Sequence, residues 1–411
     1  MPGTRTRVML LRGELAMRPV RTVIAIMFAA AIAVTGCTAH SAAVQPGTPS
    51  PSTTASPTSN PPQPEPTPPT TTFPLGRIER LDAVQAVGSQ TVWAVGKGTI
   101  LTTSNGGRTW LRVWRGAQEL DQVDFVNAST GWALGGHLLL GTVDRGQHWR
   151  QLGQPTAGPL RRVQFSSPTQ GWGVAGGSGQ PSQGPRVTTS LVHTSDGGQT
   201  WSVLAAPAPP QSVCFTGTAD GWLASGTSVW RSVDGGHHWG PRPSFTLPAP
   251  TYGLPAFAEL QCARPGAAWV RFDAGDAAAG HIPYALYTTR DGGAHWRGVL
   301  GEPGTLGSRL GLPAGPGNSP GPFSVIDPSR AVLLSPTPAA EATGAMLITQ
   351  AGGRLQRLRD IPQTRLSTIS PSSVSFASAT RGWVVGTGGA GRAVILATDD
   401  GGRSWQSQLP A

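Results

Sequence analysis

Short apolar runs recur seven times between residues 79 and 411 of this chain. Each unit begins with two apolar or small residues two positions apart, a spacing that puts both side chains on one side of a β-strand. The pairs are Val84/Ala86, Val123/Phe125, Val163/Phe165, Val213/Phe215, Leu260/Cys262, Phe323/Val325 and Val374/Phe376. Seven residues later a Gly-Trp, or a substitute for it, opens a second apolar run. The pattern predicts short strands.

A second signature, Thr/Ser-x-Asp-x-Gly, follows in each unit and predicts a tight hairpin. The Asp or Asn accepts hydrogen bonds from its own turn, and glycine supplies the positive φ that the turn needs. Six units end this hairpin on Trp, and twelve of the fourteen tryptophans belong to one of the two signatures. The predicted structural hairpin residues are Asn105, Asp144, Asp196, Asp234, Asp291 and Asp400.

Each unit therefore resolves into four strands, here called A to D. Seven units of about 48 residues fall within the range of propeller blades. We predict an all-β fold, a seven-bladed β-propeller of four-stranded antiparallel blades over residues 73–411, with six or eight blades as alternatives. The sixth blade is degenerate, because Val332, Ala351 and Gln356 replace its signature residues. The expected blades are approximately 79–117, 118–156, 157–208, 209–250, 251–300, 301–362 and 363–411.

The hairpins resemble the Asp-box, or BNR, repeats of sialidases and sortilin-type propellers. With the preceding Gly-Trp-Ala-type run, as at Gly131–Gly135, the whole pattern is similar to the photosystem II assembly and stability factor family. The resemblance implies a propeller and suggests a chaperone or scaffold for a protein complex. It says little about the particular function, because one propeller fold serves many unrelated roles.

The N-terminal residues resemble a bacterial lipoprotein signal peptide. Arg18 and Arg21 precede an uncharged run from Thr22 to Val34, which is short for a membrane span. The run ends at Val34-Thr35-Gly36-Cys37, similar to a lipobox. We therefore expect residues 1–36 to be removed and Cys37 to be acylated, which predicts an exported protein anchored at the outer face of the cell membrane. Met17 is an alternative start.

Residues 37–72 are predicted to be a linker. Positions 38–72 contain ten Pro and fourteen Ser or Thr, a composition that favours an extended spacer over a packed core. We expect this segment to hold the propeller away from the membrane, either bare or glycosylated.

Charge and motifs exclude several function classes. Loss of the five Arg and one Glu in residues 1–36 lowers the surplus from +10 to +6, and the basic residues form no run with interleaved aromatics, which disfavours nucleic acid as a partner. His237-His238 lacks a third ligand at metal-site spacing. The Gly386-x-Gly388-x-x-Gly391 string precedes an expected strand instead of a helix. We predict no metal and no cofactor.

Cys214 and Cys262 remain if Cys37 is acylated. Cys262 is the second member of its strand A pair, whereas Cys214 lies between the members of its own. Opposite faces of successive blades meet in a propeller, so both thiols are expected between the fourth and fifth blades. A blade-to-blade disulfide is our hypothesis, and two buried free thiols are the alternative.

The sequence favours a binding protein over an enzyme. Sialidases need an Arg cluster and a Tyr nucleophile paired with Glu, yet the three tyrosines are Tyr252, Tyr284 and Tyr287. We assign no catalytic residue. Long, variable B–C and D–A connections are expected on the face opposite the Asp boxes, where loops commonly carry function. The candidate partner contacts are Arg271, Asp273, His281, Tyr284 and Tyr287.

The predicted function is binding of an envelope protein or protein complex, with membrane contact through the lipid anchor alone. The alternative is a propeller that binds or hydrolyses a cell-wall glycan.

Overall fold

The computed structural model describes residues 73–177, 188–240, 242–247, 257–274, 282–335, 344–351, 354–357 and 365–409. All of them belong to one compact unit, Thr67–Ala411. The predicted signal peptide, Cys37, the linker and His281 lie outside the described residues.

The strands of the described residues form seven antiparallel sheets, called blades 1 to 7 in chain order. Blades 1 and 2 contain β1 (Leu81–Ala86), β2 (Val92–Thr103), β3 (Leu111–Glu119), β4 (Gln122–Phe125), β5 (Gly131–Gly135), β6 (Leu138–Thr142) and β7 (Arg150–Gln151). Blades 3 and 4 contain β8 (Leu160–Phe165), β9 (Gly171–Gly176), β10 (Thr189–Thr194), β11 (Ser202–Leu204), β12 (Ser212–Thr216), β13 (Asp220–Ser225), β14 (Ser228–Ser232) and β15 (Phe245–Thr246).

The remaining strands continue the same order. Blades 5 to 7 contain β16 (Phe257–Arg264), β17 (Ala267–Asp273), β18 (Tyr284–Thr289), β19 (Arg297–Gly301), β20 (Phe323–Asp327), β21 (Arg330–Ser335), β22 (Gly344–Ala351), β23 (Arg354–Arg357), β24 (Ile369–Phe376), β25 (Gly382–Gly388), β26 (Ala393–Thr398) and β27 (Gln406–Ser407). The described residues also form the short helices α1 (Thr305–Arg309), η3 (Arg365–Thr368) and η4 (Gly389–Gly391).

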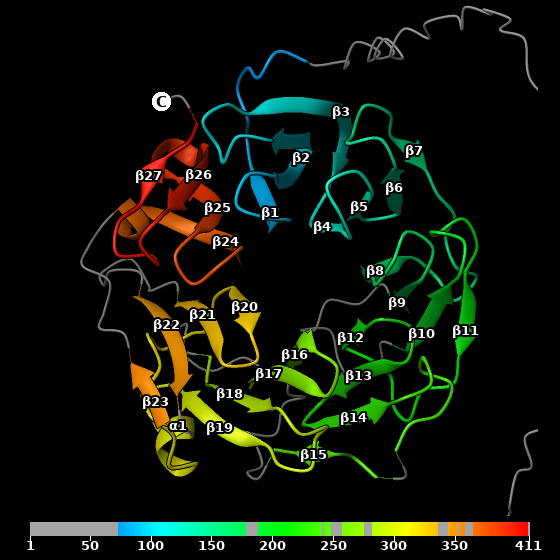
Figure 1. Ribbon diagram of the computed structural model, residues 1–411, viewed down its shortest axis with the longest axis vertical. Helices are drawn as coiled ribbons and strands as arrows, with labels where there is room; N and C mark the ends of the chain where they lie inside the picture. Colours follow the sequence, from blue (N-terminus) through cyan, green and yellow to red (C-terminus); the bar gives the residue numbers. More distant parts are fainter. Residues whose placement is uncertain are drawn as a thin grey trace, which may run out of the picture. The chain divides into compact units, whose positions relative to one another are not determined.

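The sheets surround a central opening, with the first strand of each blade innermost (Figure 1). Within every sheet, neighbours in sequence are neighbours in space. The predicted β-propeller of four-stranded antiparallel blades is therefore confirmed. The degenerate sixth blade keeps all four strands, because backbone pairing of β22 with β23 continues where the signature residues are missing.

Blade 1 contains only three named strands, because β2 includes two strand segments joined by a turn. Its first half pairs with β1 and its second half with β3. The Thr102 hydroxyl donates to Val92 O at 3.2 Å, although ten extended residues span about 33 Å. Gly98, at φ +64°, provides the left-handed turn. β2 thus supplies both strand B and strand C.

The hydrophobic cores lie between successive blades. In the contacts from blade 1 to blade 4, each strand B Trp stacks on the strand A Phe of the next blade, with ring centroids 3.4 to 4.0 Å apart. The closing Trp of that next blade meets the Phe edge-on, as Trp149 meets Phe125 at 6.1 Å. The signature tryptophans therefore join one blade to the next, and burial of such rings is a large source of stability.

The Asp-box hairpins have one repeated hydrogen-bond pattern. The Thr194 hydroxyl donates to Asp196 Oδ1 (2.8 Å) and accepts the Gly198 N–H (2.9 Å). Asp196 Oδ1 also accepts the Thr200 N–H at 2.9 Å. Equivalent bonds occur in the hairpins of Asn105, Asp144, Asp234, Asp291 and Asp400. These side chains stabilise their own turns.

Blade 7 meets blade 1 without a shared strand in the described residues, since β24 to β27 and β1 to β3 form separate sheets. One buried cluster spans both blades and includes Leu81, Trp110 and Trp383. The segment before β1 crosses this contact: Phe73 N–H donates to Arg112 O (2.9 Å), and Ala393 N–H donates to Ile78 O (3.4 Å).

Candidate functional site

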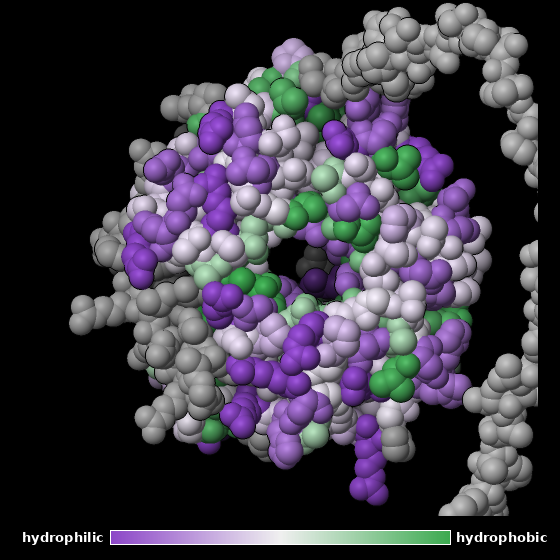
Figure 2. Space-filling view, in the orientation of Figure 1, coloured by the Kyte–Doolittle hydropathy of each residue, from purple (hydrophilic) through white to green (hydrophobic). Residues whose placement is uncertain are grey.

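A channel of about 810 Å³ occupies the centre of the ring and is lined by the first strand of every blade. Figure 2 shows its opening. Seven buried apolar residues, one from each blade, contribute to its wall: Val84, Val123, Val163, Val213, Leu260, Phe323 and Val374. They are the first members of the strand A pairs that the sequence pattern identifies.

Charged side chains gather at one end of the channel, and we call this end the rim. It consists of Asp82, Asp121, Arg161, Arg162, Glu259 and Arg271. The first strands begin and the second strands end here, as the pairing of Glu259 with Arg271 illustrates. The Asp-box hairpins follow the third strands and lie at the opposite end. The rim is thus on the face that carries the B–C and D–A connections.

Arg271 holds together the part of the rim that blade 5 contributes. Its guanidinium donates to Asp273 Oδ1 (2.8 Å) and Oδ2 (2.9 Å) and to Gly321 O (2.5 Å), and it lies 3.1 Å from Glu259 Oε2. Burial opposes its charge, but the two carboxylates raise the pKa of Arg271 above its usual value. Arg271 therefore stays cationic inside the ring wall.

The other candidate partner contacts occupy different positions. Tyr284 is fully buried and its hydroxyl donates to Gly317 O at 3.0 Å. Tyr287 is packed in the core between blades 4 and 5. Burial raises the pKa of both phenols. Arg271 and Asp273 form an ion pair, and Tyr284 is the cross-strand partner of Asp273. Of the described candidates only Arg271 lines the channel.

A second group of residues links the blades around the channel. The residue between the two members of each strand A pair, here called the middle residue, reaches the second member of the pair in the next blade. Phe125 N–H donates to Gln85 Oε1 (2.5 Å), and Phe215 N–H donates to Gln164 Oε1 (2.6 Å). Both glutamines also donate to the carbonyl of the same residue. Each Gln therefore replaces a two-bond strand pairing.

The middle residues of the other blades make the corresponding contact. Val325 N–H donates to Gln261 Oε1 (2.9 Å), Phe376 N–H to Ser324 Oγ (3.2 Å) and Ala86 N–H to Ser375 Oγ (2.9 Å). The last bond joins blade 7 to blade 1. We call the complete set the inner girdle: Gln85, Asp124, Gln164, Cys214, Gln261, Ser324 and Ser375.

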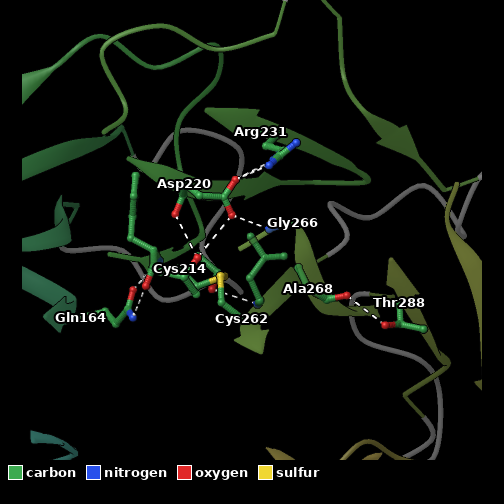
Figure 3. Close-up of a disulfide and its surroundings, with 12 residues drawn as sticks. Gln164, Cys214, Asp220, Arg231, Cys262, Gly266, Ala268 and Thr288 are labelled. Carbon is green, nitrogen blue, oxygen red and sulfur yellow. Dashed lines mark hydrogen bonds and ion pairs between the residues drawn. A yellow bond between two sulfur atoms is a disulfide. The ribbon is translucent and has the colours of Figure 1, made fainter. Parts of the chain in front are cut away.

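Cys214 is the middle residue of blade 4, and it is joined by a disulfide to Cys262 in blade 5 (Figure 3). The Cα atoms are 5.7 Å apart. Cys262 is the second member of its strand A pair, so the disulfide occupies the place of the hydrogen bond found between other blades. This is the contact that the strand positions of the two cysteines predict.

Asp124 is the ionisable residue of the girdle, and its Oδ2 accepts the Phe165 N–H at 2.5 Å. The carboxyl is partly open to the channel but lies deep within the ring. Burial raises its pKa to about 7, against the opposing effect of the hydrogen bonds from Phe165 and Gln85. Asp124 therefore changes charge near neutral pH.

The described part of the chain contains no group of three or more metal-ligating side chains. None of the helices described is long and apolar enough to cross a membrane.

The comparisons with known proteins support the fold. No protein-family model and no curated protein matches the sequence. A solved structure described as YCF48 bound to D1 peptide is 16% identical, with 80% of this chain and 96% of that chain covered, at a TM-score of 0.50.

Two glycoside hydrolases are also similar. For the GH74 enzyme of Niastella koreensis the identity is 13%, the coverage 81% of this chain and 55% of that chain, and the TM-score 0.55. For an ancestral GH74 enzyme the values are 14%, 84%, 48% and 0.53. This chain thus spans about half the length of those enzymes. At these identities the likeness establishes the β-propeller and leaves the function open.

Proposed function

We propose that this protein is a non-catalytic, lipid-anchored propeller of the cell envelope that binds a segment of a protein partner at the rim. The observation that carries the proposal is the rim itself: charges of both signs surround an opening whose wall is apolar further in. Such a surface suits a protein segment, which offers charged groups beside an apolar side chain.

Arg162 is the rim residue best placed to meet a partner. Its guanidinium lies 5.8 Å from the centre of the Phe257 ring, and it is partly exposed at the channel. No carboxylate within ion-pair distance of it is seen among the described residues. An incoming carboxylate or backbone carbonyl therefore has a planar set of donors available there.

The occupied state of the carboxylates argues against glycoside hydrolysis. That reaction needs two carboxyl groups, one as acid and one as base or nucleophile. Asp82 pairs with Arg80 at 2.8 Å, Glu259 and Asp273 pair with Arg271, and Asp124 binds a backbone N–H. Among the described channel carboxylates Asp121 has no side-chain partner, and both oxygens of Asp124, whose pKa is raised to about 7, accept hydrogen bonds from Phe165 and Gln85.

The solved neighbour that binds D1 peptide lends support of a weaker kind, because its propeller is nearly the same size as this one. We extend to this chain the general idea of peptide capture, and no particular complex.

The partner test is an affinity purification of the full-length protein, crosslinked in its own envelope, run beside a glycan array and a turnover assay. We expect recovery of a specific protein that Arg162→Glu loses and Val143→Glu retains. Val143 is an exposed apolar residue on an Asp-box hairpin and serves as the matched control. Saturable glycan binding or product release, with no protein recovered, contradicts the proposal.

The anchor rests on the Val34-Thr35-Gly36-Cys37 sequence. Cys37→Ala is expected to move the protein from the membrane fraction to the soluble fraction, because acylation then has no thiol to modify. Retention of Cys37→Ala in the membrane fraction would falsify the anchor.

A further inference from the structure

We propose that the Cys214–Cys262 disulfide is a redox-active site whose exchange with a dithiol loosens the channel wall between blades 4 and 5. The reason lies in the inner girdle. At each of the six other girdle positions, a side-chain oxygen of the middle residue accepts a backbone N–H of the next blade. At this contact a sulfur takes its place, and the link is covalent.

Reduction removes that link without supplying a substitute. A thiol is a weak acceptor, so the reduced Cys214 makes no hydrogen bond comparable to that of Gln164 in blade 3. The separation of blades 4 and 5 stays local, because hydrogen bonds on both sides of the disulfide still join the two blades. Leu260 N–H donates to Ser212 Oγ (3.0 Å) on the rim side, and Gly266 N–H donates to Asp220 Oδ2 (2.8 Å) toward the Asp boxes. Blade 5 therefore stays attached.

The disulfide is placed for chemistry from the channel. Cys214 and Cys262 both line it, and Cys262 is the more exposed of the two, since Cys214 is 4% exposed. A thiolate of the dithiol attacks Cys262 Sγ, and Cys214 leaves as a thiolate that takes up a proton. The second thiol of the reductant then attacks the mixed disulfide, and Cys262 leaves as a thiolate that is protonated in turn. Two electrons pass to the protein, and the dithiol becomes a disulfide.

Loosening here acts on the rim. Cys262 and Glu259 belong to the same strand, β16, and Glu259 is one of the carboxylates that hold Arg271. Displacement of β16 therefore shifts the charged groups of blade 5. Control of partner binding by this route rests on the proposed function, whereas the opening of the contact does not.

The test is hydrogen exchange of the native protein with and without dithiothreitol, followed by mass spectrometry and a thiol count. We expect reduction to free two thiols and to raise exchange in β12 and β16 at least tenfold, with β4 and β8 unchanged. No exchange change after reduction, or resistance of the native disulfide to dithiothreitol, overturns the proposal. Two free thiols before any treatment overturn it as well.

Two double variants make the test independent of the reductant. Cys214→Gln with Cys262→Val rebuilds the Gln acceptor of blade 3, so its exchange should match that of the oxidised protein with or without dithiothreitol. Cys214→Ala with Cys262→Ala lacks both links and should exchange like the reduced protein. If a variant fails to fold, the comparison on the unsubstituted protein still decides. None of these readouts involves a partner, so failure here is distinct from failure of the proposed function.

Discussion

The Asp-box hairpins and the inner girdle both repeat around the ring, but the hairpins repeat a set of bonding groups and the girdle repeats a position. The hairpins keep one chemistry, in which a Thr or Ser hydroxyl joins the Asp or Asn side chain to a glycine N–H. The girdle keeps one geometry, the reach from a middle residue to the next blade. It fills that geometry with Gln, Asp, Cys or Ser. A hairpin must satisfy its own turn, whereas a girdle position needs only a group that spans the gap.

Removing the covalent link is expected to have the largest effect on stability. The disulfide closes a loop between residues 48 apart, and loop-closure entropy of that size corresponds to about 4 kcal/mol. We predict that the Cys214→Ala/Cys262→Ala variant loses up to this amount of unfolding free energy in urea denaturation. A loss below about 1 kcal/mol would mean that the hydrogen bonds beside the disulfide hold this contact alone.

Breaking a glutamine link should cost somewhat less. Gln164→Met keeps the volume but leaves the N–H and C=O of Phe215 without their partner, a loss of about 3 kcal/mol. Gln118 is an exposed residue of β3, and Gln118→Met, as control, should stay within about 0.5 kcal/mol of the unsubstituted protein. Equal losses of unfolding free energy from both substitutions would show that the Gln164 link stabilises the protein no more than an exposed glutamine does.

The hairpins should respond to single atoms in the same range. Thr194→Val removes the hydroxyl that joins Asp196 to the Gly198 N–H, and about 2 kcal/mol of unfolding free energy should be lost. Thr194→Ser should be nearly neutral, because Ser232 makes the same bonds in blade 4. A stable Thr194→Val protein would contradict the stapling role of the hairpin.

The two regions should depend on pH with opposite signs. Hydrogen bonds from His295 lower the pKa of Asp291 to about 2, so its stabilisation is present above pH 4 and is lost as the pH falls toward 2. Burial raises the pKa of Asp124 to about 7, so its contribution is present below pH 4 and is lost as the pH rises to 7. A group such as Asp124 changes the slope by at most about 1.4 kcal/mol per pH unit, and Asp291 changes it by less, because its side chain is exposed and solvent screens its charge.

Substitution by Asn tests each sign separately. We expect Asp124→Asn to flatten the decline in unfolding free energy between pH 4 and 7, and Asp291→Asn to flatten the acid limb below pH 4. Urea denaturation across this range measures both. If Asp124→Asn alters the acid limb instead, the assignment of the raised pKa to Asp124 is wrong.

The smallest effect is expected where one hairpin departs from the repeat. Arg145 has φ +64° at a position that is glycine in the other described Asp boxes. The left-handed conformation costs a non-glycine residue roughly 1–2 kcal/mol, so Arg145→Gly should raise unfolding free energy by about 1 kcal/mol. The reverse change, Gly197→Arg, should be destabilising, since a Cβ there would lie 2.8 Å from Pro168 O. Destabilisation by Arg145→Gly would show that the arginine is required.

The difference between the two regions also explains which features of the fold can be predicted from the sequence. The hairpins and strand A pairs repeat recognisable residues, so the blades, their order and the neighbourhood of Cys214 and Cys262 follow from the sequence. The sequence pattern does not reveal the inner girdle, because Gln85, Asp124 and Ser375 share no residue type. Their common role becomes visible only when the structure places successive first strands side by side. Its one signal was a non-apolar residue between two apolar ones.

The candidate site is harder to predict from the sequence than the blades, for a related reason. Tyr284 and Tyr287 follow a long connection in the sequence, which favoured exposure, yet both side chains face the core. Arg161 and Arg162 stand at the start of an ordinary strand, and only the ring brings them to the same opening as Arg271.

The most direct test of the account is site-specific photo-crosslinking in living cells, with the crosslinking amino acid placed either at Arg162 on the rim or at Val143 on an Asp-box hairpin. We predict a partner protein crosslinked from position 162 and none from position 143. A partner captured from position 143 and absent from position 162 would contradict the assignment of function to the rim.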